Sequence, residues 1–248
     1  MWEDVLLFAA IGFAAQMVDG AIGMAYGLTG TSVMLGLGIP APVASASVHA
    51  AEVFTTGMSG FWHWRLGNIR WPLVWKLAVP GMIGGALGAY VLVATPSEYI
   101  RPAVYAYLFV MGGWILFKAI RRTAAGHTDG PRWVRPLGFA GGFLDAVGGG
   151  GWGPMVASTM IGHGAQPRFA IGSVNTAEFF VTTVISITFL GTIGLELWPM
   201  ITGLIIGGAC AAPLAALATR HVPDRPMMML VGAVILLLSL RGLLQTIG

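Results

Sequence analysis

The chain is organised around two glycine-rich stretches, QMVDGAIGMAYGLTG (16–30) and GFLDAVGGGGWGPM (142–155). The apolar regions that contain them, 5–38 and 134–164, are each longer than one crossing of a bilayer and shorter than two. Glycine adopts backbone conformations that other residues avoid. Inside hydrocarbon, non-helical backbone survives only where it is buried in protein or lines a watery cavity. We therefore predict two broken or re-entrant helical segments at the centre of the molecule.

The composition excludes an ordinary soluble protein. Of the 248 residues, 56% are hydrophobic and only 9% are charged, whereas a soluble domain carries about 25% charged residues. A helix needs about 20 residues to cross the hydrocarbon core. Apolar blocks of this length occur at 41–62, 73–94, 101–120, 167–190, 198–219 and 226–247. The chain is thus predicted to be an all-α polytopic membrane protein with six full transmembrane helices beside the two broken segments.

The two halves of the chain are related by an internal repeat. Residues 12–56 and 138–182 align without a gap, and 17 of the 45 aligned positions are identical. A polar interval separates the halves. The predicted division is a first transmembrane repeat at 1–120, a polar cytoplasmic linker at 121–133 and a second transmembrane repeat at 134–248. Each repeat then holds one glycine-rich broken segment and three full helices.

The distribution of Lys and Arg indicates how the repeats are oriented. If each glycine-rich segment enters and returns on one side, 11 of the 13 Lys and Arg residues lie on the cytoplasmic side; if each crosses once, 9 of them do. Positive charge accumulates in cytoplasmic loops. The charge distribution therefore favours inverted repeats, with the N-terminus outside and the linker inside.

Paired broken segments in two repeats are typical of secondary transporters, in which they meet at a binding site near the midplane. A new helix that starts near Gly27 or Gly153 directs free N–H groups and its positive dipole end towards a cavity, which suits an anion. The alternative is close helix packing by small residues. The predicted anion contacts in these loops are Gly23, Gly27, Gly148, Gly149, Gly150, Gly151 and Gly153.

Polar side chains repeat on one face of the following helix. His49 and Glu52 are three residues apart, and the second half repeats the pattern as Asn175 and Glu178. A buried carboxyl group can hold a proton near neutral pH, so either glutamate is a candidate to carry a coupling proton. The alternative is a hydrogen bond between helices. The side chains predicted to contact the anion are His49, Asn175, Ser47 and Ser173.

Asp19 and Asp145 lie where the first part of each broken segment should end. Their predicted role is structural, as acceptors for N–H groups of the loop that follows, with proton or cation binding as the alternative. The chain has one cysteine and lacks the sequence patterns of zinc proteases, serine hydrolases and ATPases. No metal, cofactor or enzymatic activity is expected. The net charge of +3 gives no nucleic-acid footprint.

Three stretches carry a resemblance to a known family: FAAQMVDGAIGMAYGLTGTSV, ASASVHAAEVFTTGMSGFWHWRLGNI and GGFLDAVGGGGWGPMV. Over essentially its full length the chain resembles the TauE/SafE family of sulfite exporters. The resemblance implies a multi-pass protein of the bacterial inner membrane that exports sulfite or a small organosulfur anion such as a sulfonate. Its partners would be this anion and the lipid bilayer, and assembly with further copies of the chain is left open.

The sequence leaves alternatives to proton- or potential-coupled export. A passive anion channel has the same composition, and an intramembrane enzyme would use His49 and Glu52. The first glycine segment also departs from the second, because Met24 and Ala25 stand where the second has Gly150 and Gly151. The two loops therefore need not contribute equally to a site.

Overall fold

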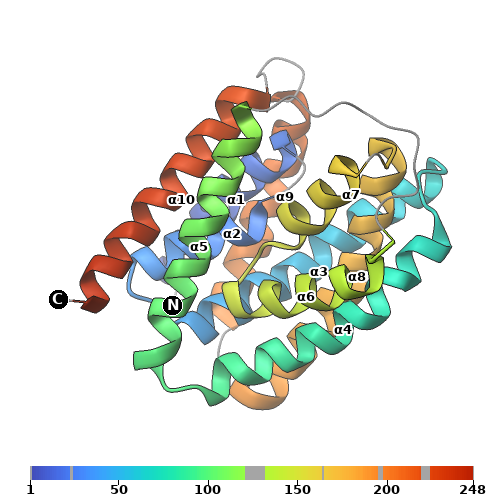
Figure 1. Ribbon diagram of the computed structural model, residues 1–248. Helices are drawn as coiled ribbons and strands as arrows, with labels where there is room; N and C mark the ends of the chain where they lie inside the picture. Colours follow the sequence, from blue (N-terminus) through green and yellow to red (C-terminus); the bar gives the residue numbers. More distant parts are fainter. Residues whose placement is uncertain are drawn as a thin grey trace.

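A computed structural model describes residues 2–22, 25–120, 132–163, 165–194, 198–218 and 224–247, and these residues form an all-helical molecule (Figure 1). The first half contains α1 (Trp2–Ile22), α2 (Tyr26–Gly36), α3 (Ala41–Arg65), α4 (Trp71–Ala94) and α5 (Ser97–Ile120). The second half contains α6 (Val134–Gly148), the π-helix η1 (Gly153–Ala157), α7 (Ser158–Gly162), α8 (Pro167–Ile193), α9 (Trp198–Ala218) and α10 (Asp224–Ile247).

Helices are present at all six positions predicted to cross the membrane, namely α3, α4, α5, α8, α9 and α10. Within the described residues, four segments are both long and apolar enough to cross: Trp71–Ala94, Ser97–Ile120, Phe169–Ile193 and Met228–Thr246. The stretch Trp198–Ala211 of α9 is apolar but shorter. Helix α3 has the required length, but its buried polar residues lower its hydropathy. The chain is thus a polytopic membrane protein by length and composition.

Both glycine-rich segments are broken helices. In the first, α1 ends at Ile22 and α2 begins at Tyr26, with Ala25 at a φ of 139°. In the second, α6 ends at Gly148 and η1 begins at Gly153, and the φ values of the intervening Gly149, Gly150 and Gly151 are 68°, 144° and 135°. Only glycine adopts such positive φ angles without strain. The helices restart within one residue of the predicted positions, Gly27 and Gly153.

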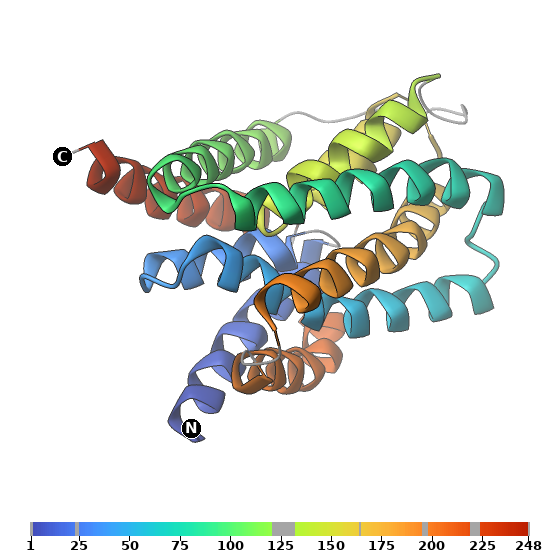
Figure 2. The same cartoon turned by 90° about the horizontal axis from the view of Figure 1, so that it is seen from below.

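The broken segment of each half packs against a helix of the other half. Helix α1 lies along α9, and α6 lies along α4, while α3 pairs with α8 and α5 with α10. Figure 2 shows the α3–α8 pair between the α4–α6 pair and the α1–α9 pair. Glycine permits these close approaches. A Cβ atom added at Gly138 of α6 would lie 2.6 Å from the carbonyl oxygen of Leu77 on α4.

Candidate functional site

A polar cavity of about 270 Å³ lies where the two broken segments meet the α3–α8 pair. Its walls come from α1, α2, α3, the connection between α6 and η1, the start of η1, and α8. The lining residues are Gln16, Asp19, Ala25, Tyr26, Gly27, Glu52, Thr55, Thr56, Ser59, His63, Gly151, Gly153, Pro154, Ile171, Asn175 and Glu178. Both halves of the chain therefore contribute to one site.

The two glycine-rich loops touch each other beside this cavity. A Cβ atom added at Gly27 would lie 2.7 Å from the Cα of Gly150, and one added at Gly150 would lie 2.6 Å from the Cα of Gly27. Any side chain at either position would force the two backbones apart. The glycines are thus required for the close approach of the two broken segments, in addition to the positive φ angle at Gly150.

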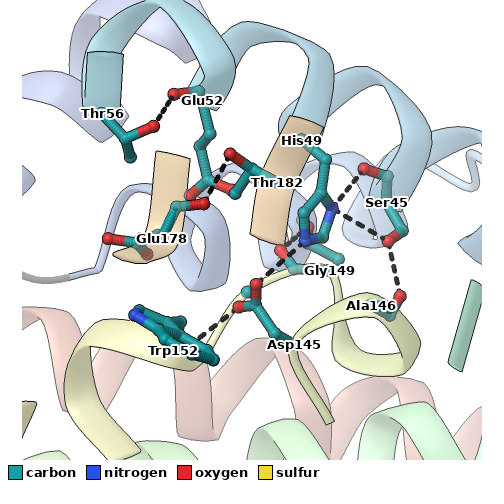
Figure 3. Close-up of polar contacts among 12 residues, drawn as sticks. Ser45, His49, Glu52, Thr56, Asp145, Ala146, Gly149, Trp152, Glu178 and Thr182 are labelled. Carbon is teal, nitrogen blue, oxygen red and sulfur yellow. Dashed lines mark hydrogen bonds and ion pairs between the residues drawn. The ribbon is translucent and has the colours of Figure 1, made fainter. Parts of the chain in front are cut away.

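Glu52 of α3 and Glu178 of α8 line the same cavity (Figure 3). The Glu52 carboxylate accepts a hydrogen bond from the backbone N–H of Gly27, at the start of α2. Its other oxygen, Oε2, is buried and has no hydrogen-bond partner within the described residues. An ionised oxygen buried without a donor is costly, whereas a neutral carboxyl group has an O–H that can donate into the cavity. The surroundings of Glu52 therefore favour its neutral form.

Each break is held by an aspartate from the helix before it. Asp19 Oδ1 accepts the N–H of Tyr26 at 3.2 Å, and Asp145 Oδ1 accepts the N–H of Trp152 at 2.9 Å. The acceptor and donor are seven residues apart in both halves. These bonds satisfy an N–H group that would otherwise be without a helical partner at the start of the new helix. The geometry is that of a structural acceptor in each break.

Asp145 also joins the two halves through His49. Its Oδ2 lies 3.2 Å from His49 Nε2, and both side chains are almost fully buried (Figure 3). His49 Nδ1 lies 2.8 Å from the carbonyl oxygen of Ser45, which can only accept, so Nδ1 carries a hydrogen. The contact between Nε2 and Oδ2 then holds one shared proton. This hydrogen bond ties α3 of the first half to the end of α6 in the second half.

Three further side chains hold the second loop. Ser45 donates to the carbonyl oxygen of Ala146 at 2.6 Å, Tyr107 of α5 donates to that of Gly150 at 2.9 Å, and Thr31 of α2 donates to that of Gly149. The indole Nε1 of Trp152 donates to the carbonyl oxygen of Val174 on α8 at 3.2 Å. Non-helical carbonyl groups in a membrane need such partners. The loop is thus fixed by contacts with four helices.

The structure brings seven of the predicted site residues to the cavity: Gly27, Gly151, Gly153, Asn175, Glu52, Glu178 and Asp19. Gly148, Gly149 and Gly150 lie in the loop beside the cavity but do not line it, because they pack against Tyr107, Thr31 and Gly27 respectively. Asp145 is buried behind the loop with His49. Gly23 lies outside the described residues.

Three predicted anion contacts lie away from the cavity. His49 is fully buried between Ser45 and Asp145, with both ring nitrogens engaged. The Ser47 hydroxyl lies 3.9 Å from Met200 Sδ on α9, and the Ser173 hydroxyl accepts the backbone N–H of Arg70 at 2.9 Å. The serines lie two residues before His49 and Asn175, and such neighbours point to different sides of a helix. None of the three lines the cavity.

Two further cavity residues on α3 were not predicted. Ser59 and His63 follow Glu52 at helical spacing on α3, so extending the polar stripe by two turns would have found them. Ser59 accepts a hydrogen bond from Asn175 Nδ2 at 3.0 Å. Gln16 of α1 also lines the cavity, and its buried Oε1 has no partner within the described part of the chain. The same part contains no group of three side chains able to hold a metal ion.

Comparison with known proteins identifies the class. The profile of the family described as Sulfite exporter TauE/SafE matches residues 8–242. A protein of Bacillus subtilis (strain 168), "Probable membrane transporter protein YtnM", is 39% identical over 251 residues, covering 98% of this chain and 84% of that protein. No solved structure gives a significant match. A polytopic helical fold with these relatives is a multi-pass transporter of the bacterial membrane. The chain belongs to the TauE/SafE family.

Proposed function

We propose that the protein is a secondary transporter that exports sulfite or a small organosulfur anion across the bacterial inner membrane, with protons as the coupling ion. One observation carries the proposal: the two broken segments and the glutamates of α3 and α8 converge on a single polar cavity. Broken helices that meet at one site are typical of secondary transporters. The cavity volume is roughly nine times the 30 Å³ that a water molecule occupies in the liquid, which suits a small oxyanion.

Neutral donors for the anion are available on the cavity wall. Asn175 has two N–H groups, of which one donates to Ser59. The backbone of Gly151 and Gly153 also lines the cavity. Hydrogen bonds to an anion are stronger than those between neutral groups. Asn175, Ser59 and the second loop are therefore the proposed anion contacts.

The charges on the cavity wall support proton coupling. Its described acidic residues are Asp19, Glu52 and Glu178, and its one described basic side chain is His63. Ionised carboxylates close to an anion would repel it. The anion therefore binds when the glutamates hold protons, and anion and protons occupy the cavity together. Because both glutamates line the cavity whereas His49 and Asp145 do not, the proposed proton carriers are Glu52 and Glu178.

We further propose that the two repeats are inverted and related by a pseudo-two-fold axis. Equivalent elements make equivalent contacts: α1 packs on α9 as α6 packs on α4. The contact of Gly138 with Leu77 is matched by one between Gly12 and Leu204. Inverted repeats would give alternating access by motion of one half against the other around the cavity.

Cysteine labelling tests the inverted topology. The exposed Cys210 is first replaced by serine, and single cysteines are placed at Glu3 and Gln245. In intact cells, a membrane-impermeant maleimide should label the cysteines at both positions 3 and 245, because three full crossings in each repeat bring the C-terminus back to the outside. Protection of both positions until the membrane is opened would rule out inverted repeats that start outside.

Transport assays in proteoliposomes test the function. We expect labelled sulfite and a small sulfonate to exchange across the membrane with saturation, and sulfate to be transported more slowly because its charge is higher and it carries no proton near neutral pH. Empty liposomes and protein inactivated by heat are the controls. An ohmic conductance without saturation would instead identify a passive channel, and failure to move any of these anions would refute the proposed substrate class.

A further inference from the structure

A second recess lies at the start of α4 and is separate from the transport cavity. It has a volume of about 910 Å³. Its lining includes three exposed cationic side chains, Lys76, Arg132 and Arg135. Among the described residues, none that lines it is acidic, and none also lines the cavity that contains Glu52. The recess therefore has a strongly positive field and is distinct from the proposed transport site.

An apolar groove continues from this recess along α4. The groove has a volume of about 390 Å³ and shares Lys76 and Arg135 with the recess. Its wall is formed by Trp75, Val79, Pro80 and Ile83. Val79 is 47% exposed and Ile83 is 61% exposed. In a membrane protein, such a surface along a spanning helix faces the acyl chains of lipid.

The junction of recess and groove lies at a membrane–water interface. Trp71 and Trp75 are exposed at the first turns of α4 and stack on each other, with ring centroids 6.5 Å apart. Tryptophan gathers at the level of lipid headgroups. The cations are thus at headgroup level, and the apolar groove runs from them towards the bilayer centre.

We propose that this surface binds one anionic phospholipid, with its phosphate held by Lys76, Arg132 and Arg135 and an acyl chain in the groove along α4. Basic pockets between transmembrane helices at the cytoplasmic side attract anionic headgroups. Arginine also binds phosphate oxygens through two parallel N–H donors. A soluble anion would use only the cations, whereas a phospholipid uses the cations and the adjoining apolar groove.

The bound lipid would bridge the two halves of the chain. Lys76 belongs to α4 of the first half, and Arg135 belongs to α6 of the second. Helix α6 ends in the glycine loop that lines the transport cavity. A lipid held by both residues therefore braces the α4–α6 pair, which supports that loop. This inference depends on the membrane location of the chain and not on the identity of the transported anion.

Native mass spectrometry of the purified full chain tests the proposal. The protein in detergent is titrated with phosphatidylglycerol and with phosphatidylcholine of the same acyl chains. We expect phosphatidylglycerol to bind more tightly to the unmodified protein, and Lys76→Gln with Arg135→Gln to weaken its binding by about fivefold for each cation removed. The control is Arg101→Gln with Arg241→Gln, which removes two exposed cations elsewhere and should leave the preference unchanged.

Competition with inorganic phosphate determines whether the site binds a phospholipid or only a phosphate group. Inorganic phosphate should not displace phosphatidylglycerol at equal concentration, because it lacks the acyl chain that occupies the groove. The proposal is overturned if the unmodified protein shows no preference for phosphatidylglycerol, if the Lys76 and Arg135 variant binds it as well as the control variant does, or if inorganic phosphate competes equally. Size-exclusion chromatography of each variant verifies folding, so a lost preference can be assigned to the removed charges.

Discussion

Replacing both Glu52 and Glu178 with glutamine is expected to give a folded transporter that no longer responds to a proton gradient. Glutamine has nearly the same size and keeps an oxygen to accept the N–H of Gly27, but it does not titrate. Both side chains line the cavity, so the substitution keeps these two positions neutral at every pH. The variant should therefore still bind the anion, while losing the proton that accompanies it.

The expected effect follows from the energy stored in the gradient. A difference of about one pH unit corresponds to about 1.4 kcal/mol per proton, or about tenfold in the accumulation ratio. The unmodified protein should show up to about tenfold accumulation per coupled proton, and the double variant should show none. The assay uses a sulfonate as well as sulfite, because the charge of a sulfonate does not change with pH and any response then belongs to the protein.

The matched control is Glu98→Gln, which removes an exposed acid at the start of α5. It should keep the full response to the gradient. The single variants, Glu52→Gln and Glu178→Gln, determine whether one or both carboxyl groups carry protons. If the double variant retained the complete response of the unmodified protein, both glutamates would be structural and the proposed coupling would be wrong.

Removing the Asp145 side chain is expected to cause the largest loss of stability. Asp145→Ala leaves the N–H of Trp152 and the His49 ring without an acceptor, in a site where both aspartate and histidine are almost fully buried. Breaking a buried pair by removing one partner costs about 3–5 kcal/mol. The variant should unfold at a markedly lower temperature in detergent and lose transport as its loop loses support.

Asp19→Ala is the matched comparison, because Asp19 occupies the equivalent position in the first half. Its carboxylate accepts a hydrogen bond from the N–H of Tyr26 and, within the described residues, pairs with no histidine. The expected loss is the smaller cost of unsatisfied backbone groups, about 1–3 kcal/mol. Asp145→Asn keeps an acceptor for Trp152 and a donor for a neutral His49, so it should restore much of the stability. Equal unfolding temperatures for Asp145→Ala and Asp19→Ala would contradict the role assigned to the pair.

Much of this architecture can be predicted from the sequence. Apolar blocks of spanning length predict the six long helices, and the glycine runs predict both breaks, because glycine is the residue that tolerates the φ angles found at 149–151. The polar stripe predicts which face of α3 carries Glu52. These features depend on spacing along one segment, which the sequence contains directly.

The sequence does not show which segment of the other half each helix face contacts. His49 and Glu52 share one face of α3, yet His49 contacts Asp145 behind the second loop, whereas Glu52 lines the cavity. His49 lies about one helical turn before Glu52 along α3, and this offset gives the two side chains different surroundings. Ser47 and Ser173 are predicted to contact the anion, but the packing of α9 and of the connection before α4 takes them elsewhere.

The most direct test of proton-coupled export is to record anion and proton movement together in proteoliposomes that contain the unmodified protein. Vesicles loaded with a labelled sulfonate and a pH-sensitive dye are diluted into buffer without the anion, with the membrane potential clamped by potassium and valinomycin. We predict that loss of the sulfonate from the lumen is accompanied by a rise in lumenal pH, since protons leave with the anion, and that the Glu52 and Glu178 double variant shows sulfonate loss without this rise. Sulfonate efflux from the unmodified protein at constant lumenal pH would contradict the proposal.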